Sequence, residues 1–240
     1  MPEITYDFHI HSCLSPCADD DMTPANIIGM AKLKELRAIA ITDHNTCRNC
    51  GPAMELGEEA GILVIPGMEL TTAEEVHVIC LFETLSDAMA FDSYVYQRLQ
   101  KIVNNPMIFG NQFVVDAHEQ VLSYEPYLLI NATTISFDEV YSLVKEFHGI
   151  MIPAHIDKNS NSLLSNLGFI PVESQFTCVE VKELESLPFI QNQNPYVNQC
   201  RVISNSDAHN LWGLNEAIHR IYVKEVTTKE VLKALNLLLN

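Results

Sequence analysis

Histidine and carboxylate side chains recur in this sequence inside, or directly after, short apolar runs. His9 lies in the run 4–10 and His11 directly after it, and at this spacing of two residues the pleat of a strand would direct both to one face. Asp207 and His209 have the same spacing after the run 202–204. The other members of this set are Asp43, His44, Glu69, His77 and His155.

Imidazole combined with carboxylate is a ligand mixture that suits divalent zinc, manganese or iron. The set is too large for a single tetrahedral ion, so we expect two or three divalent ions. A cavity that holds several such ions carries net positive charge and attracts a phosphate group.

Apolar runs of strand length alternate with amphipathic or punctuated segments, as expected of βα units. The runs cover 4–10, 38–42, 62–65, 76–82, 150–153, 178–181, 202–204 and 218–223. Helices are predicted over 25–36, from 86 to about 103, over 137–147 and over 229–238. The strand ends of a parallel barrel open on one face, so the ligand set would meet there.

The stretch 104–131 breaks this alternation. Its two short apolar runs, 113–115 and 121–124, predict an inserted hairpin. No linker-like composition flanks the stretch, so we interpret residues 1–240 as a single domain that contains an insertion.

Six motifs follow one another along the chain: His9-Ile10-His11, Ile41-Thr42-Asp43-His44, Gly67-Met68-Glu69, Val76-His77-Val78, Pro153-Ala154-His155 and Ser206-Asp207-Ala208-His209. This ordered set resembles the motifs of the PHP (polymerase and histidinol phosphatase) superfamily over essentially the full chain. The resemblance is to the small stand-alone phosphoesterases of that superfamily. It implies an α/β fold, a distorted (β/α)7 TIM-like barrel, with three metal ions.

The resemblance also implies a ligand set for each ion. One ion would be held by His9, His11, Glu69 and Asp207, a second by Glu69, His77 and His155, and a third by Asp19, His44 and His209. The loop after His11 is longer than the family pattern and ends in three acidic residues. Asp19 lies four residues before Thr23-Pro24, where the pattern has its aspartate, and Asp20 is the alternative.

Three further residues have expected roles beside the metal ligands. Asp43 would orient a neighbouring ligand, because metal-bound histidines usually donate their other N–H group to a carboxylate. Arg48 and Lys158 follow the His44 and His155 motifs, where each would either contact a substrate phosphate or remain a solvated basic side chain.

Four of the seven cysteines lie in the loops expected after the first two strands. Cys13, Cys17, Cys47 and Cys50 could form an additional zinc or iron–sulfur site. The alternative is that they are buried or free thiols, since free cysteine behaves as a small hydrophobe.

The charge balance restricts the class of substrate. The chain has 14 Lys and Arg against 31 Asp and Glu, a formal charge of -17. Such a surface repels long nucleic acids and anionic membranes. No segment has a membrane-spanning or signal pattern, so we expect a soluble cytoplasmic protein.

These observations predict a trinuclear-metal phosphoesterase. A metal-bound hydroxide would attack phosphorus in small phosphomonoesters, nucleotides or short oligonucleotides. An amidohydrolase-type C–N hydrolase is an alternative, since barrel metals also activate water for that reaction. A non-catalytic metal-binding regulatory module is another.

Overall fold

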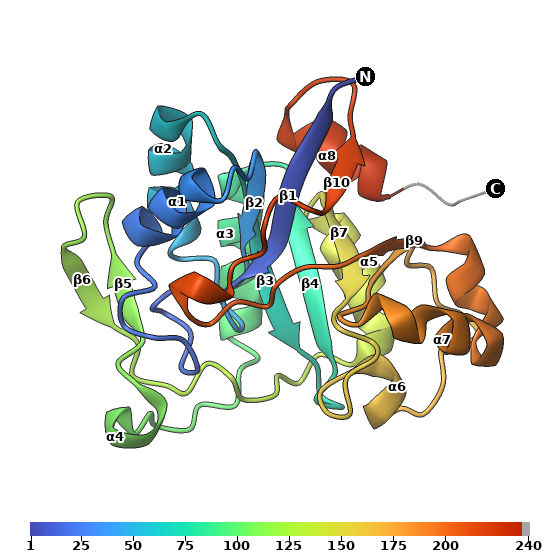
Figure 1. Cartoon of the computed structure of the whole chain (residues 1–240). Coiled ribbons are helices and arrows are strands. Elements are labelled where there is room, and N and C mark those ends of the chain that lie inside the picture. Colours follow the sequence, from blue (N-terminus) through green and yellow to red (C-terminus); the bar gives the residue numbers. More distant parts are fainter. Residues whose placement is uncertain (237–240) are drawn as a thin grey trace.

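The structure is a computed structural model that describes residues 1–236. Its centre is a curled sheet of six strands in the order β10-β1-β2-β3-β4-β7 (Figure 1). The strands are β1 (Glu3–Ile10), β2 (Ala38–Ile41), β3 (Leu63–Thr71), β4 (His77–Phe82), β7 (Gly149–Pro153) and β10 (Arg220–Tyr222).

A two-stranded parallel sheet continues the curl beyond β7. It pairs β8 (Cys178–Glu180) with β9 (Arg201–Ile203), and the N–H group of Ile156 donates to the Glu180 carbonyl at 2.9 Å. After β9 the chain returns to the first strand, where Ile10 and Ala208 form an isolated parallel bridge. The strands therefore surround a common axis, which confirms the predicted distorted α/β barrel.

The direction of β4 is the main departure from a regular barrel. β1, β2 and β3 are parallel, whereas β4 is antiparallel to both β3 and β7. Thr71 at the end of β3 pairs with His77 at the start of β4. The first residue of β4 therefore reaches the rim at which β3 and β7 end.

Helices cover the outside of the barrel and one of its ends (Figure 1). They are α1 (Pro24–Leu33), α2 (Cys50–Ala60), α3 (Leu85–Tyr96), α4 (Pro106–Phe109), α5 (Phe137–Glu146), α6 (Leu163–Asn166), α7 (Leu187–Gln193) and α8 (Thr228–Leu235). The sequence pattern did not predict α2, α4, α6 or α7. The predicted end of the last helix, at 238, lies outside the described residues. Within residues 1–236, no helix combines the length and the apolar character needed to cross a membrane.

The predicted helix from 86 to about 103 begins within one residue of its predicted start, at Leu85, and is wrong at its C-terminal end. Thr84 caps α3, because its hydroxyl accepts from the Asp87 N–H group at 3.1 Å. The helix ends at Tyr96, and the following residues pair with the segment before α5 instead. Leu99 forms an antiparallel bridge with Thr133. The insertion contains α4 and the predicted antiparallel hairpin, formed by β5 (Phe113–Val115) and β6 (Val121–Tyr124).

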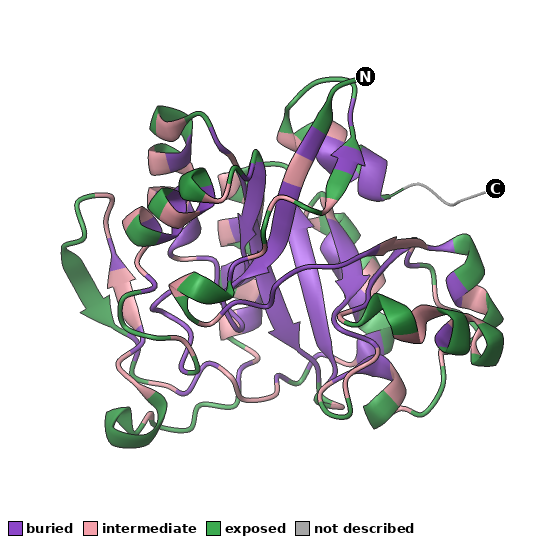
Figure 2. Ribbon diagram, in the orientation of Figure 1, coloured by how far each residue is buried: buried purple, intermediate pink, exposed green. Residues whose placement is uncertain are grey.

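The apolar core has two layers, one inside the barrel and one between the sheet and the helices. The strands of the central sheet are mostly buried (Figure 2). Ile65, Ile79 and Ile152 belong to the inner layer, and Val231 and Leu235 of α8 pack into the same cluster. The inner layer therefore fills the barrel at the end where β1 begins, which leaves the opposite rim for polar side chains.

A register shift in β1 decides which way its histidines face. Tyr6 and Phe8 belong to the inner cluster, but Ile10 belongs to the outer one, although strict alternation would place all three on one face. The pairing of β1 with β2 is irregular between Asp7 and Ile10. This bulge reverses the alternation, so that His9 and His11 project into the barrel.

Candidate metal centre

Glu69 lies at the centre of the polar rim, and imidazoles surround its carboxylate. Its place follows from alternation in β3, where Ile65 and Gly67 also face the barrel interior. Glu69 Oε1 lies 2.9 Å from His77 Nδ1 and 3.2 Å from Nε2 of both His9 and His155. Glu69 Oε2 lies 3.0 Å from His44 Nδ1 and 3.3 Å from His11 Nε2. All six side chains are buried.

Asp207 supplies a second carboxylate to the same space. Its Oδ1 lies 3.3 Å from His9 Nε2 and 3.2 Å from His11 Nε2. His155 and Asp207 have φ angles of 29° and 53°, in the left-handed region that residues other than glycine rarely adopt. Such strain is concentrated at functional sites, and both residues contribute side chains to this cluster.

The cluster fits divalent metal ions. Glu69 Oε2 and His44 Nδ1 lie 3.0 Å apart without the geometry of a hydrogen bond. Together with His155 Nδ1 they are buried atoms that have no hydrogen-bond partner in the described chain. A buried polar atom without a partner costs free energy, so such atoms need an explanation. Two overlapping groups have ligand atoms close enough to share an ion: His9, His11 and Glu69, and His44, Glu69 and His77. Nitrogen and oxygen donors in this ratio suit zinc, manganese or iron.

Glu180, which sequence reasoning missed, holds two of these histidines. Its Oε2 lies 3.1 Å from His9 Nδ1 and accepts the N–H group of His155 at 2.8 Å. Its Oε1 accepts Asn205 Nδ2 at 2.7 Å. An N–H group on His9 Nδ1 leaves Nε2 free for a metal ion. The available signal was a carboxylate inside the short apolar run 178–181.

Asp43 lies outside the imidazole cluster and acts on His11 through Ser15. Asp43 Oδ1 accepts the Ser15 hydroxyl at 2.7 Å, and Ser15 Oγ lies 3.0 Å from His11 Nδ1. Ser12 donates its N–H group to Asp43 Oδ1 at 2.7 Å and its hydroxyl to Oδ2 at 2.6 Å. This chain of contacts sets the His11 ring with Nε2 toward Glu69.

The two predicted phosphate contacts lie in different places. Lys158 is at the rim, where its ammonium group donates to Asp207 Oδ2. The guanidinium group of Arg48 instead contacts Glu125 in the insertion, and Arg48 Nε donates to Thr46 at 3.1 Å. Arg48 is absent from the residues that line the pocket over the cluster.

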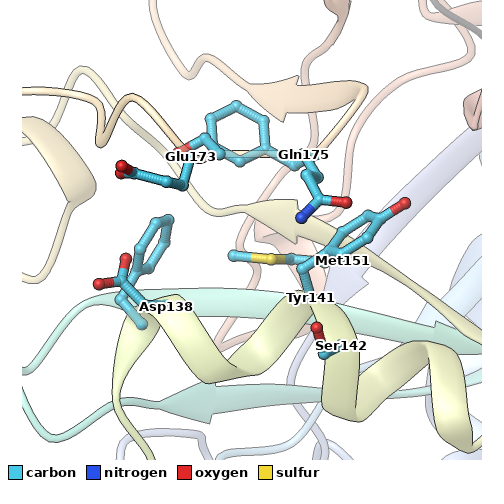
Figure 3. A pocket seen from close by; sticks show the side chains of 9 residues that line it. Asp138, Tyr141, Ser142, Met151, Glu173 and Gln175 are labelled. Carbon is cyan, nitrogen blue, oxygen red and sulfur yellow. The ribbon is translucent and has the colours of Figure 1, made fainter.

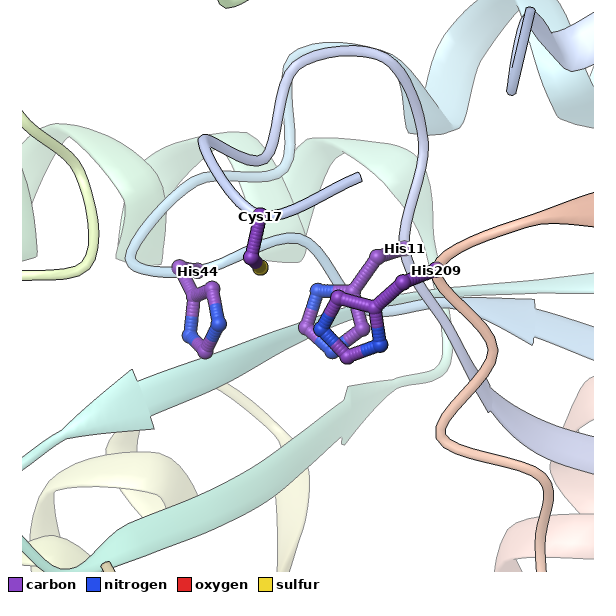
Figure 4. Close-up of side chains that lie close together, drawn as sticks. All are labelled: His11, Cys17, His44 and His209. Atoms are coloured by element: carbon purple, nitrogen blue, oxygen red, sulfur yellow. The ribbon is translucent and has the colours of Figure 1, made fainter. Parts of the chain in front are cut away.

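The structure does not bring Asp19 to the cluster. Its side chain is exposed, and its N–H group donates to the His209 carbonyl at 2.9 Å. Asp20 is also exposed and accepts Asn111 Nδ2 at 3.0 Å. The thiol of Cys17 lies beside His11, His44 and His209 instead (Figure 4).

The proposed four-cysteine site does not form within residues 1–236. No three of Cys13, Cys17, Cys47 and Cys50 come close enough to share an ion. Cys50 lies in the first turn of α2, and its thiol contacts the Ile41 and Gly67 carbonyls at 3.5 and 3.4 Å. The Cys13 thiol contacts the Phe113 carbonyl at 3.9 Å. The physical reason is that Cys13, Cys47 and Cys50 are packed as buried thiols, whereas Cys17 alone turns toward the imidazoles.

Electrostatics divide the imidazoles into two kinds. Burial acts to lower the pKa of His9 and His11, but neighbouring carboxylates raise the pKa of His9 well above its usual range and that of His11 to about 9. Burial lowers the pKa of His44 well below its usual range and that of His209 to about 4. Burial acts to raise the pKa of Glu69, yet the histidines around it hold that pKa well below its usual range. His44 and His209 therefore present neutral nitrogens at pH 7.

A cavity of about 170 Å³ opens over the cluster and is lined by Cys17, His44, Glu69, His77, Ile130, His155, Lys158, Ser160, Asn161, Asp207 and His209. A separate cavity of about 270 Å³ lies between α5 and the segment 173–176 (Figure 3). Asp138 and Glu173 line that second cavity, and its lining contains no basic side chain. It therefore lacks the groups that bind an anionic substrate.

Comparisons with known proteins agree with this geometry. A family model described as PHP domain matches residues 7–238. An uncharacterised protein of Methanocaldococcus jannaschii is 37% identical over 76 residues, which cover 28% of this chain and 44% of the relative. The 5'-3' exoribonuclease Rnm of Escherichia coli is 35% identical over 78 residues, 32% of this chain and 26% of that enzyme. The matches thus span less than half of either relative.

Two solved structures share the fold. The lesion-specific endonuclease PfuEndoQ of Pyrococcus furiosus has a TM-score of 0.69 at 20% identity, covering 98% of this chain and 56% of that one. An amidohydrolase of Chromobacterium violaceum has a TM-score of 0.59 at 15% identity, covering 98% of both chains. The family match and the buried His and Glu groups together support a metal-dependent hydrolase.

Proposed function

The chain belongs to the PHP domain family, and from this premise we propose that it is a metal-dependent phosphoesterase. The observation that carries the proposal is the Glu69 carboxylate, which has five imidazole nitrogens within 3.3 Å. Hydrogen bonding within residues 1–236 leaves Glu69 Oε2 unsatisfied, which supports a cluster that would hold cations among these side chains.

In this proposal His9, His11, Glu69 and Asp207 hold one ion, and Glu69, His77 and His155 hold a second. Divalent ions at these positions lower the pKa of water and offset negative charge on phosphate oxygens. Glu180 keeps His9 oriented through Nδ1, and Ser15 does the same for His11. Asn161 Nδ2 lies 3.1 Å from His77 Nε2 and fixes that ring from its outer side.

Lys158 is the residue that we assign to the substrate phosphate. Its side chain is 38% exposed, whereas that of Asp207 is 6% exposed, so the ammonium group lies on the solvent side of the carboxylate. From there it can donate to a phosphate oxygen while Asp207 remains with the ions. A lysine at this place binds phosphate as a mobile point charge.

The size of the cavity and the negative charge of the whole chain favour a small substrate. The cavity of about 170 Å³ is smaller than pockets for drug-sized ligands, which range over about 300–1,000 Å³. The formal charge of -17 gives the surface little attraction for a long phosphate backbone. We therefore propose phosphomonoesters, nucleotides or short oligonucleotides as substrates.

The test combines metal analysis with a substrate panel. Protein purified without chelators is expected to contain bound zinc, manganese or iron, and to hydrolyse p-nitrophenyl phosphate, a nucleotide or a dinucleotide. The panel also includes a single strand, a DNA duplex with an abasic site and an anilide. His155→Ala is the control that separates this activity from a contaminant. Turnover of the anilide alone, or protein free of metal, would refute the proposal.

A further inference from the structure

The Cys17 thiol lies among imidazoles of the candidate metal centre. Its sulfur and one nitrogen each of His11, His44 and His209 lie within 4.8 Å of one another (Figure 4). The His11 and His209 rings stack with centroids 4.3 Å apart, and the His11 and His44 centroids are 4.6 Å apart. Sulfur thus occupies the space in which the family pattern expects an aspartate.

The loop after β1 is folded so that it presents this thiol. The N–H groups of Ser15 and Ala18 donate to the Ser12 and Ser15 carbonyls at 2.9 and 3.1 Å, which makes two successive turns. The N–H group of Asp19 then donates to the His209 carbonyl and ties the end of the loop to the opposite side of the site. The Cys17 thiol points toward the imidazoles although the residue is exposed, whereas the Asp19 side chain is left in solvent (Figure 4).

The surrounding imidazoles have nitrogens available for an ion. His209 Nδ1 lies 2.8 Å from the Asp207 carbonyl, so its N–H group is used there and Nε2 stays free. His44 is 2% exposed, and its Nδ1 has no hydrogen-bond partner in the described chain. His11 Nε2 faces Glu69 and Asp207 and serves the neighbouring ion.

We propose that Cys17, His44 and His209 hold the third ion of the centre, with a thiolate in the place predicted for Asp19. This inference rests on the proposed function, because it adds a ligand to the same metal centre. Binding replaces the thiol proton with the metal ion and releases that proton to water. A thiolate with two imidazoles selects zinc or iron over manganese or magnesium. Three protein ligands leave a coordination position open, as in catalytic zinc sites.

Cobalt(II) tests the proposal without any measurement of activity. When Co²⁺ is added to chelator-treated protein, we expect a thiolate-to-cobalt charge-transfer band in the near ultraviolet. The band should be lost in Cys17→Ser, which should also bind one equivalent of Co²⁺ less in equilibrium dialysis. Asp19→Asn and Cys13→Ser are the matched controls, because they alter the competing carboxylate and the other thiol of the same loop. Both controls should keep the band.

One further variant tests which metal ions the position selects. Cys17→Asp should restore the missing equivalent with an oxygen ligand, so that Mn²⁺ competes against Zn²⁺ for this position better than it does in the parent protein. A parent protein that binds Co²⁺ without the band, or a Cys17→Ser protein that keeps it, overturns the cysteine ligand and leaves the phosphoesterase proposal intact. A parent protein that binds no Co²⁺ overturns both.

Discussion

Replacing Glu180 by glutamine keeps the shape of the side chain but exchanges one acceptor oxygen for an NH₂ group, which is a donor. Every partner of the carboxylate is a donor: the N–H group of His155 at Oε2, Asn205 Nδ2 at Oε1, and His9 Nδ1 between them. A glutamine amide therefore places an NH₂ group against either His155 or Asn205. The backbone donor cannot rotate, and Asn205 is fixed because its Oδ1 accepts the Phe8 N–H group at 2.8 Å.

The expected loss of folding stability follows from this clash between donors. One buried donor without a partner costs about 1–3 kcal/mol, so metal-free Glu180→Gln should be less stable by that amount. The second effect is on metal affinity, because the His9 ring loses the acceptor that fixes Nε2. Loss of such an outer-shell partner weakens metal binding by about 10–100-fold, or about 1.4–2.8 kcal/mol.

The assay is competition with a chromophoric chelator, together with denaturant unfolding of the metal-free protein. Glu183→Gln is the matched control, because it makes the same change of charge at an exposed position on the neighbouring segment. If Glu180→Gln binds zinc as tightly as the control and unfolds at the same denaturant concentration, the positioning role of Glu180 is refuted.

Three further predictions concern the same barrel. Asp207→Asn should reduce phosphoesterase turnover by about 100-fold or more while the circular dichroism spectrum is retained, because the ions lose a charged ligand and Lys158 loses its partner; turnover near that of the parent protein would contradict the ligand assignment. Gly67→Ala should destabilise the protein by about 1–3 kcal/mol in urea unfolding, because a Cβ atom there would lie 2.7 Å from Leu81 Cδ2 and 3.1 Å from the Cys80 carbonyl. Gly29→Ala is the control, since a Cβ atom at that position meets nothing within 4 Å. In the metal-free protein the pKa of His11 is raised to about 9. The stabilisation by its charged form is therefore complete below the ordinary histidine pKa and is lost as the pH rises through about 9. Melting temperatures measured from pH 6 to pH 10 should fall more steeply for the parent protein than for His11→Gln, and equal slopes would contradict this.

Sequence reasoning could predict the barrel and the meeting of its polar residues because both depend on local pattern. Apolar runs mark strands wherever these are buried, and a polar residue at the end of such a run projects at the rim. The i, i+2 spacing of His9 and His11 fixes their common face in any strand. It does not fix which face, and the bulge between Asp7 and Ile10 decides that point.

Other features depend on contacts between distant segments. Apolar periodicity is the same for a strand in either direction, so the reversal of β4 and the entry of His77 at its first residue could not be predicted. The choice of Cys17 over Asp19 depends on two loop turns and on a hydrogen bond to His209. Glu180 was hidden because an isolated carboxylate in a short run has no partner in sequence; its partners, His9 and Asn205, come from opposite ends of the chain.

The reversed strand also changes what forms the entrance to the site. In a barrel built only from βα units, each strand that ends at the rim continues into a loop and a helix. Here β3 and β4 are joined by the tight turn 72–76, closed by the Thr72 N–H group at 2.9 Å from the Val76 carbonyl. Glu74 and Glu75 on this turn line a neighbouring cavity that shares Ile130 and Asn161 with the cavity over the cluster, so the turn forms a lip beside the mouth. Residues inserted into this turn would lengthen one side of the entrance without displacing Glu69 and His77, because both residues are held by the pairing of β3 with β4.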